Sequence, residues 1–139
     1  RAAIDKATAP ETLKAILDDE CKVKSLLAEV KPGYNTPVMA AAQIAAISQY
    51  VMAGDNAAWW KFWADDRTQE RKLWAKALLT AAAEAKDDYV TEYYLDQLRW
   101  CGMACQAKCV QAIADKSESK AVKDMAAIVI DQITGAAIN

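Results

Sequence analysis

SESKAVKDMAAIVIDQI, residues 117–133, is the stretch that decides the fold class. Two serines open it, and serine just before an apolar run is typical of a helix N-terminus. Apolar residues then recur at the spacing of one helix face, at Val122, Met125, Ala126, Val129 and Ile133. Ile128 and Ile130 widen this stripe, which predicts a helix that its neighbours cover on more than one side.

The composition extends this prediction to the whole chain. Of the 139 residues, 54% are hydrophobic and 26% are charged, which excludes a disordered chain and suits one domain with a buried core. Only four glycines and three prolines are present, and such low numbers favour helix over sheet and loop. The net charge of −2 offers no basic field to nucleic acid, and no apolar run approaches the ~20 residues that span a membrane. We therefore expect residues 1–139 to form a single all-α domain.

Turn and capping residues divide most of the chain into three helix pairs. The predicted ranges are 20–30 with 36–53, 67–86 with 88–100, and 103–115 with 117–134. Thr36 and Pro37 are expected to begin the second of these helices, because proline suits the first helical turn. Residues 1–19 are either a linker or a partial helix. The pairs can stack as a short α-solenoid or close into a compact bundle, and the spacing leaves both open.

A valine follows a turn signal in three of the predicted helices, at Val38, Val90 and Val122. These valines are 52 and then 32 residues apart, and the shorter interval is the length of one helix pair. An insertion of about 20 residues between the first two repeats explains the longer interval. The tryptophan-rich residues 56–66 lie within that interval.

The last of these helices resembles the second helix of a HEAT repeat, in which an Asp or Ser turn precedes Val-Arg, two variable residues and Ala. Val122, Lys123 and Ala126 occupy those places. The resemblance implies a HEAT- or armadillo-like α-α superhelix of three helix pairs, with an inserted short tryptophan-rich helix. Residues 95–133 are also similar to helical-repeat modules attached to exported bacterial proteins that act on sugars. This second likeness favours export, although the compartment stays open.

Residue types that commonly carry catalysis are missing from the chain. There is no histidine, which removes the commonest general base and metal ligand. The four glycines are too scattered to build a phosphate-binding loop. The adjacent aspartates at 18–19, 65–66 and 87–88 stand at predicted helix starts, where capping accounts for them. We expect no enzymatic activity, no metal and no cofactor.

Three cysteines, Cys101, Cys105 and Cys109, are spaced four residues apart. The favoured interpretation is that Cys105 and Cys109 are small buried residues between helices. A Cys101–Cys105 disulfide is one alternative, because Gly102 is expected to break the helix after Cys101. A thiolate metal site completed by Cys21 is the other.

The tryptophan-rich segment NAAWWKFWADD, residues 56–66, raises the main functional question. On a helix, Trp59, Phe62 and Trp63 form one stripe, which we expect to dock onto the core beside Trp74. Trp60 lies at the edge of that stripe and is expected to stay partly exposed. The candidate binding residues are Trp60, Lys61, Arg67 and Trp100, with Tyr89, Tyr93 and Tyr94 as further members of an aromatic surface.

These observations leave two functional classes. The first is a non-catalytic helical-repeat scaffold, a module of a larger protein, that contacts another protein or a neighbouring domain of its own polypeptide. The second is an accessory carbohydrate-binding module of an exported glycan-processing protein. Exposed aromatic side chains serve both, because they anchor protein interfaces and stack on the apolar faces of sugar rings.

Overall fold

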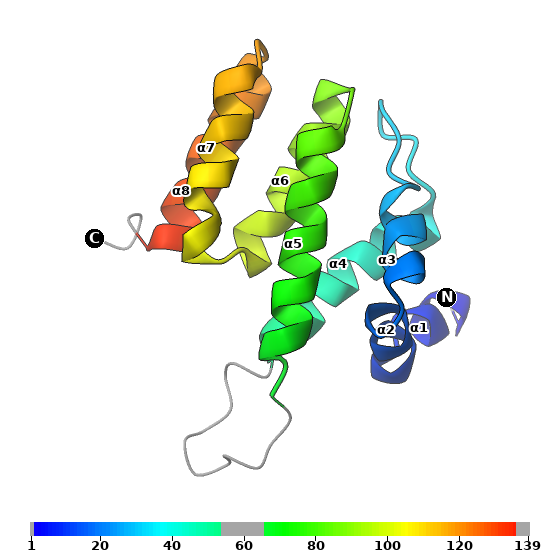
Figure 1. Cartoon of the computed structure of the whole chain (residues 1–139). Coiled ribbons are helices and arrows are strands. Elements are labelled where there is room, and N and C mark those ends of the chain that lie inside the picture. Colours follow the sequence, from blue (N-terminus) through cyan, green and yellow to red (C-terminus); the bar gives the residue numbers. More distant parts are fainter. Residues whose placement is uncertain (1, 54–65, 136–139) are drawn as a thin grey trace.

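The computed structural model describes residues 2–53 and 66–135, and all secondary structure in these ranges is helical (Figure 1). The helices are α1 (Ala2–Ala7), α2 (Pro10–Leu17), α3 (Glu20–Leu27), α4 (Val38–Ala53), α5 (Thr68–Glu84), α6 (Asp88–Cys101), α7 (Ala107–Lys116) and α8 (Lys120–Thr134). A short 3-10 helix, η3 (Ala104–Gln106), precedes α7. The all-α prediction is confirmed, and each predicted pair has a counterpart in α3–α4, α5–α6 or α7–α8.

Side-chain caps fix where several helices begin. The Asp19 carboxylate accepts the backbone N–H of Cys21 at 3.0 Å at the start of α3. Asp87 accepts the N–H of Val90 at 3.1 Å at the start of α6. Both aspartates belong to the adjacent pairs in the sequence, so capping does account for these two residues. The left-handed Gly135, with a φ of 76°, ends α8 as a C-terminal glycine should.

The start of α4 differs in detail from the prediction. The helix begins at Val38, and its first backbone bond runs from the N–H of Ala41 to the carbonyl of Pro37 at 3.0 Å. The Thr36 hydroxyl does not cap this helix, because it accepts the N–H of Lys31 at 3.0 Å instead. Thr36 therefore closes the α3–α4 loop.

The helices of the three pairs form two rows. In Figure 1, α3, α5 and α7 lie in front of α4, α6 and α8, respectively. The rear helix α6 packs against both of its neighbours in that row, α4 and α8. Residues 2–17 contain α1 and α2, and Leu13 and Leu17 of α2 join the buried core. The Gln43 side chain also bonds the carbonyl of Ala7 at 3.0 Å.

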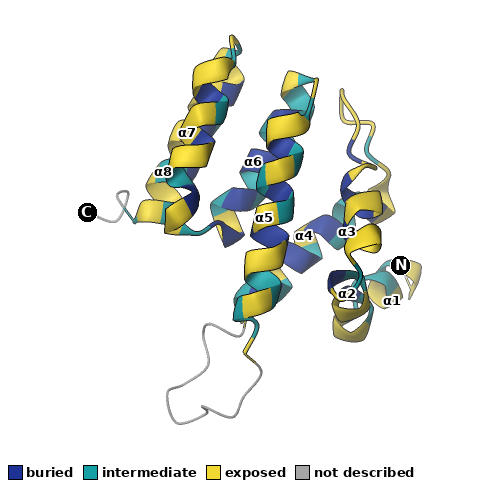
Figure 2. Cartoon of the chain, viewed as in Figure 1, coloured by how far each residue is buried: buried dark blue, intermediate teal, exposed yellow. Residues whose placement is uncertain are grey.

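The core is continuous through the centre of the molecule, where α4, α5 and α6 meet (Figure 2). Trp74 is its largest fully buried side chain, and its Nε1–H donates to the Ser48 hydroxyl at 3.0 Å. Ser48 in turn donates to Gln97 at 2.8 Å. This chain of bonds links the three helices and satisfies the indole N–H, which would otherwise be buried without a partner.

The burial of individual residues agrees only partly with the predicted valine repeat and with the predicted apolar stripe on α8. Val122 is fully buried, whereas Val38 is 73% exposed and Val90 is half-buried. The three valines therefore do not share one environment. On α8, Val122, Ala126 and Val129 are buried as predicted, but Ile128 is 43% exposed. The expectation that neighbours cover Ile128 is wrong, because this side of α8 faces solvent.

Candidate functional site

The structure describes two of the four predicted binding residues, Arg67 and Trp100. Trp60 and Lys61 lie outside the described residues, as do Trp59, Phe62 and Trp63. Arg67 is held against α4, where its guanidinium donates to the Tyr50 carbonyl at 2.8 Å and lies 3.9 Å from the centre of the Tyr50 ring. Trp100, near the end of α6, is 58% exposed. Arg67 and Trp100 therefore have different surroundings.

Helix α6 has two faces that differ in their aromatic residues. Its buried face carries Thr91, Tyr94, Leu95, Leu98 and Cys101. Tyr89, Tyr93 and Trp100 follow one another at intervals of four and seven residues, and this spacing places them on one side of a helix. Tyr89 and Tyr93 are half-buried and Trp100 is exposed. We call these three residues, together with Tyr34, the α6 stripe.

Tyr34 reaches the α6 stripe from the α3–α4 loop. Its ring lies edge-on to that of Tyr89, with the ring centres 4.8 Å apart. Tyr34 is nevertheless 85% exposed. Gly33 and Tyr34 both have a φ of 66°, in a turn that the N–H of Asn35 closes on the carbonyl of Pro32 at 3.3 Å. A left-handed tyrosine is unfavourable, and such residues concentrate at functional sites.

Sequence reasoning missed Tyr34. Its local signal is the turn PGYN at residues 32–35, which predicts an exposed loop tip. That signal cannot show that the loop tip lies beside Tyr89, because 55 residues separate the two in the chain. The prediction that Tyr94 joins the aromatic surface is wrong. Its ring is buried, and its hydroxyl donates to the Leu27 carbonyl at 2.6 Å.

Charged side chains surround the C-terminal end of the α6 stripe. The Arg99 guanidinium lies 4.7 Å from the centre of the Trp100 ring. It also pairs with the Asp96 carboxylate at 3.2 Å. The indole therefore already has a cation over it, and a carboxylate holds that cation in place.

Tyr89 and Tyr93 of the α6 stripe keep their protons at neutral pH, because the pKa of each is raised. Partial burial, and then the neighbouring Tyr34 and Glu92, raise the pKa of Tyr89. Burial, and then Tyr89 and Asp96, raise the pKa of Tyr93. Their hydroxyls remain available as neutral donors and acceptors. Glu92 follows Tyr89 by three residues, as Asp96 follows Tyr93, and side chains at this spacing are neighbours on a helix surface.

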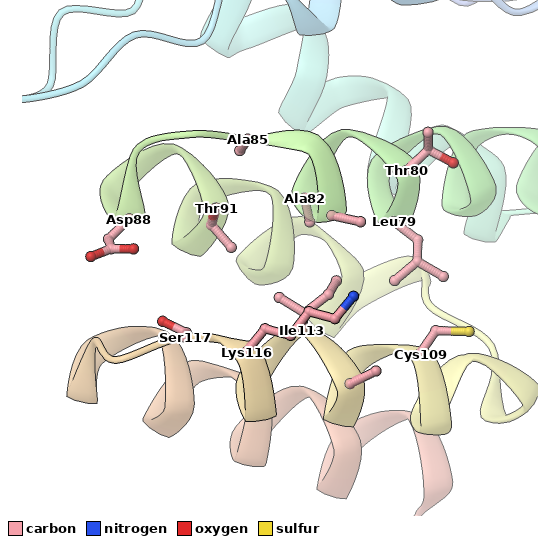
Figure 3. Close-up of a pocket in the computed structure, with 12 residues that line it drawn as sticks. Leu79, Thr80, Ala82, Ala85, Asp88, Thr91, Cys109, Ile113, Lys116 and Ser117 are labelled. Atoms are coloured by element: carbon pink, nitrogen blue, oxygen red, sulfur yellow. The ribbon is translucent and has the colours of Figure 1, made fainter.

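Two grooves flank α5. One, of about 490 Å³, lies between α5 and α7, with Asp88 and Ser117 at one end and Leu79 and Cys109 towards the other (Figure 3). The other, of about 780 Å³, is bordered by α3, α5 and α6 and is lined mainly by apolar side chains, including Leu27, Leu73 and Tyr94. Both volumes suit a small ligand.

The cysteines are arranged differently from the favoured interpretation. Cys105 and Cys109 are exposed, whereas Cys101 is fully buried at the end of α6. All four cysteines are free thiols in this structure, so the Cys101–Cys105 disulfide stays a prediction. Burial raises the pKa of the Cys101 thiol to about 11. This residue is an inert packing thiol, because its thiolate is scarce at neutral pH.

The end of α6 is sealed by close packing. Gly102 follows the helix, and a Cβ atom there would lie 2.5 Å from the Leu98 carbonyl oxygen and 2.8 Å from a methyl carbon of Ile133. The Arg71 guanidinium donates to the carbonyls of Cys101 and Gly102 at 3.1 and 3.0 Å. A glycine is favoured here because a side chain would collide with the backbone carbonyl of Leu98 in α6 itself, and also with Ile133 of α8. The predicted helix break at Gly102 is confirmed, since α6 ends at Cys101.

The described residues offer no metal centre. Within residues 2–53 and 66–135, no three Cys, Asp or Glu side chains are grouped as metal ligands. The same residues contain no helix with the length and apolar character needed to cross a bilayer. No family model matches the chain, and it has no significant match among curated proteins or solved structures.

Proposed function

We propose that this chain is a non-catalytic helical-repeat module that binds another protein, or a neighbouring domain of its own polypeptide, through the α6 stripe. The two rows of paired helices are what a short superhelix of HEAT or armadillo type would contain. The HEAT-like position Lys123 supports this reading. Its ammonium donates to the Ala114 carbonyl at 2.8 Å and so joins α8 to the end of α7.

The observation that carries the proposal is the exposure of aromatic residues that the core does not need. Tyr34 and Trp100, at the two ends of the α6 stripe, are among the most exposed large apolar side chains of the described chain. Aromatic side chains lose little conformational entropy on binding and dominate the energetics of protein interfaces. A stripe along one helix also suits a partner that lies lengthwise on α6.

A selection of random peptides displayed on phage tests this proposal. Peptides selected on the full chain should bind the Trp100→Ala and Tyr93→Ala variants at least about tenfold more weakly, as expected when an aromatic anchor is removed. Leu73→Ala is the matched control, since Leu73 is also an exposed apolar residue but lines the groove between α3 and α5. Selected peptides that bind all three variants as well as the parent chain would show that the α6 stripe is not the binding surface.

A carbohydrate partner is the second candidate. The observation in its favour is that Trp100 offers an exposed ring beside the polar groups of Asp96 and Arg99. Sugar rings need both an apolar face and hydrogen-bonding partners. Tryptophan fluorescence titrated with a panel of plant and host oligosaccharides tests this candidate. A glycan that protects the parent chain from acrylamide quenching, but not Trp100→Ala, would support it, and the absence of any response would remove it.

A further inference from the structure

A row of carboxylates runs along α6 beside the α6 stripe. Asp88, Glu92 and Asp96 are spaced four residues apart, so they share one side of the helix. Asp88 directly precedes Tyr89, and Glu92 directly precedes Tyr93. Consecutive residues point about 100° apart on a helix, so these carboxylates lie to one side of the stripe tyrosines. From Asp87 to Asp96 the chain has four acidic residues and no lysine or arginine.

Basic groups offset only part of this charge, and one part of the offset is the pairing of Arg99 with Asp96. Lys86 precedes the helix and is exposed. Lys31, in the loop that carries Tyr34, turns its ammonium to the Ala28 carbonyl at 3.2 Å. Lys120 on the neighbouring helix α8 pairs with Asp124 at 2.6 Å. The N-terminal two-thirds of the α6 stripe is therefore an aromatic surface with a net negative border.

The protein itself seats guanidinium groups on its aromatic rings. Arg99 lies over Trp100 while it pairs with Asp96, and Arg67 lies over Tyr50. In the first case the cation is held between a ring and a carboxylate. Tyr89 with Glu92 offers the same two kinds of group to a cation that comes from outside. Tyr93 with Asp96 does so through a carboxylate that the cation would share with Arg99, since Arg99 already pairs with Asp96 Oδ1.

We propose that the α6 stripe binds an extended, basic peptide segment whose lysine or arginine side chains lie over Tyr89 and Tyr93 and pair with Glu92 and Asp96. This inference rests on the proposed function and names the chemistry of the partner. The spacing of the site fits an extended chain. Tyr89 and Tyr93 are four residues apart, about 6 Å along a helix. Alternate side chains of an extended peptide repeat every 6–7 Å or so.

Three soluble peptides of about eight residues test the inference, with arginine, glutamine or glutamate at alternate positions between alanines. Isothermal titration of the full chain should show that the arginine peptide binds at least about tenfold more tightly than the glutamine peptide, with no binding of the glutamate peptide. Raising the salt concentration from about 0.05 to 0.5 M should lower the affinity for the arginine peptide severalfold, because salt screens exposed charges.

Two variants separate the roles of charge and ring. Glu92→Gln/Asp96→Asn should lower the affinity for the arginine peptide about tenfold, and Tyr93→Leu should lower it about three- to fivefold. The first variant removes the carboxylates of the cation site and the second removes one of its rings. Glu11→Gln/Asp18→Asn is the matched control. It removes the same charge from exposed positions in and just after α2 and should leave the affinity unchanged.

Each other result overturns the inference. Equal weakening by the α2 control would mean that the arginine peptide responds only to overall charge. Equal binding of the arginine and glutamine peptides, both weakened by Tyr93→Leu, would leave the α6 stripe as a protein-binding surface but would exclude a basic partner. If none of the three soluble peptides binds, and if the phage-displayed peptides bind the α6-stripe variants as well as the parent chain, the proposed function fails as well.

Discussion

The two faces of α6 carry similar residues in opposite situations. On the inner face, Tyr94 is buried with its hydroxyl bonded to Leu27. On the outer face, Tyr93 borders solvent and Trp100 is exposed. The same contrast holds for tryptophan, because Trp74 of α5 is fully buried and bonded to Ser48. The residue type does not decide the role of these side chains; their neighbours do.

This difference matters because the inner face stabilises the fold, whereas the outer face leaves aromatic surface in contact with solvent. A buried aromatic side chain contributes to stability through the area that it removes from water. An exposed aromatic side chain contributes little to stability and keeps its surface for a partner. Substitutions at the two faces should therefore separate folding from binding.

The largest effect is expected at Trp74. Trp74→Ala leaves a large cavity and removes the N–H donor to Ser48, so the free energy of unfolding should fall by about 3–5 kcal/mol. Urea denaturation followed by circular dichroism measures this loss. Leu73→Ala, at the neighbouring and partly exposed position, is the control and should cost about 1 kcal/mol or less. Similar losses for both variants would show that Trp74 is not central to the core.

The buried thiol of Cys101 should make stability depend on alkaline pH. Its pKa in the folded chain, about 11, is above its ordinary value of 9.0. A raised pKa means that the folded state resists losing the proton, so this contribution is complete below about pH 9 and is lost as the pH rises towards 11. The loss should reach about 2–3 kcal/mol at most.

Denaturation of the parent chain and two variants across this pH range tests the prediction. In Cys101→Ala the free energy of unfolding should fall less steeply as the pH rises. Cys109→Ala, which removes an exposed thiol, should keep the decline of the parent chain. An unchanged slope in Cys101→Ala would mean that other groups cause the decline, since the tyrosines of α6 also have a raised pKa.

A smaller effect is expected from removing one hydroxyl group on either face. Tyr94→Phe deletes a buried hydrogen bond, and the free energy of unfolding should fall by about 1 kcal/mol. The loss stays modest because the Leu27 carbonyl keeps the N–H of Val30 as a partner, at 3.2 Å. Tyr93→Phe, one position away on the outer face, should change stability by less than about 0.3 kcal/mol. Equal losses would contradict the division of α6 into two faces.

The smallest effect on stability is expected at Trp100. Trp100→Ala should change the free energy of unfolding by less than about 0.5 kcal/mol, because the side chain is mostly in contact with water. Acrylamide should quench the parent chain more than this variant, since the variant has lost an accessible indole. A loss comparable to that of Trp74→Ala would place Trp100 in the core and remove it from the α6 stripe.

Local signals in the sequence predicted the helices well and the surface less well. Asp19, Asp87 and Gly135 end or begin helices as expected, because a cap depends on a few neighbouring residues. Trp100 is exposed, and its role in binding stays a prediction. The prediction for Tyr94 was wrong because Tyr94 follows Tyr93 directly and therefore points about 100° away from it, onto the buried face of α6. The prediction that Cys105 and Cys109 are buried was wrong, because their spacing alone does not tell which sides of η3 and α7 other helices cover.

The sequence by itself determined that this chain is helical and roughly where α3 to α8 lie along it. These properties follow from residue types and from contacts within one or two helical turns. Only the tertiary structure decided that Cys101 is the buried thiol, that Trp74 bonds to Ser48, and that Tyr34 lies beside Tyr89. Each of these depends on segments far apart in the chain, whose meeting is set by how the helices pack.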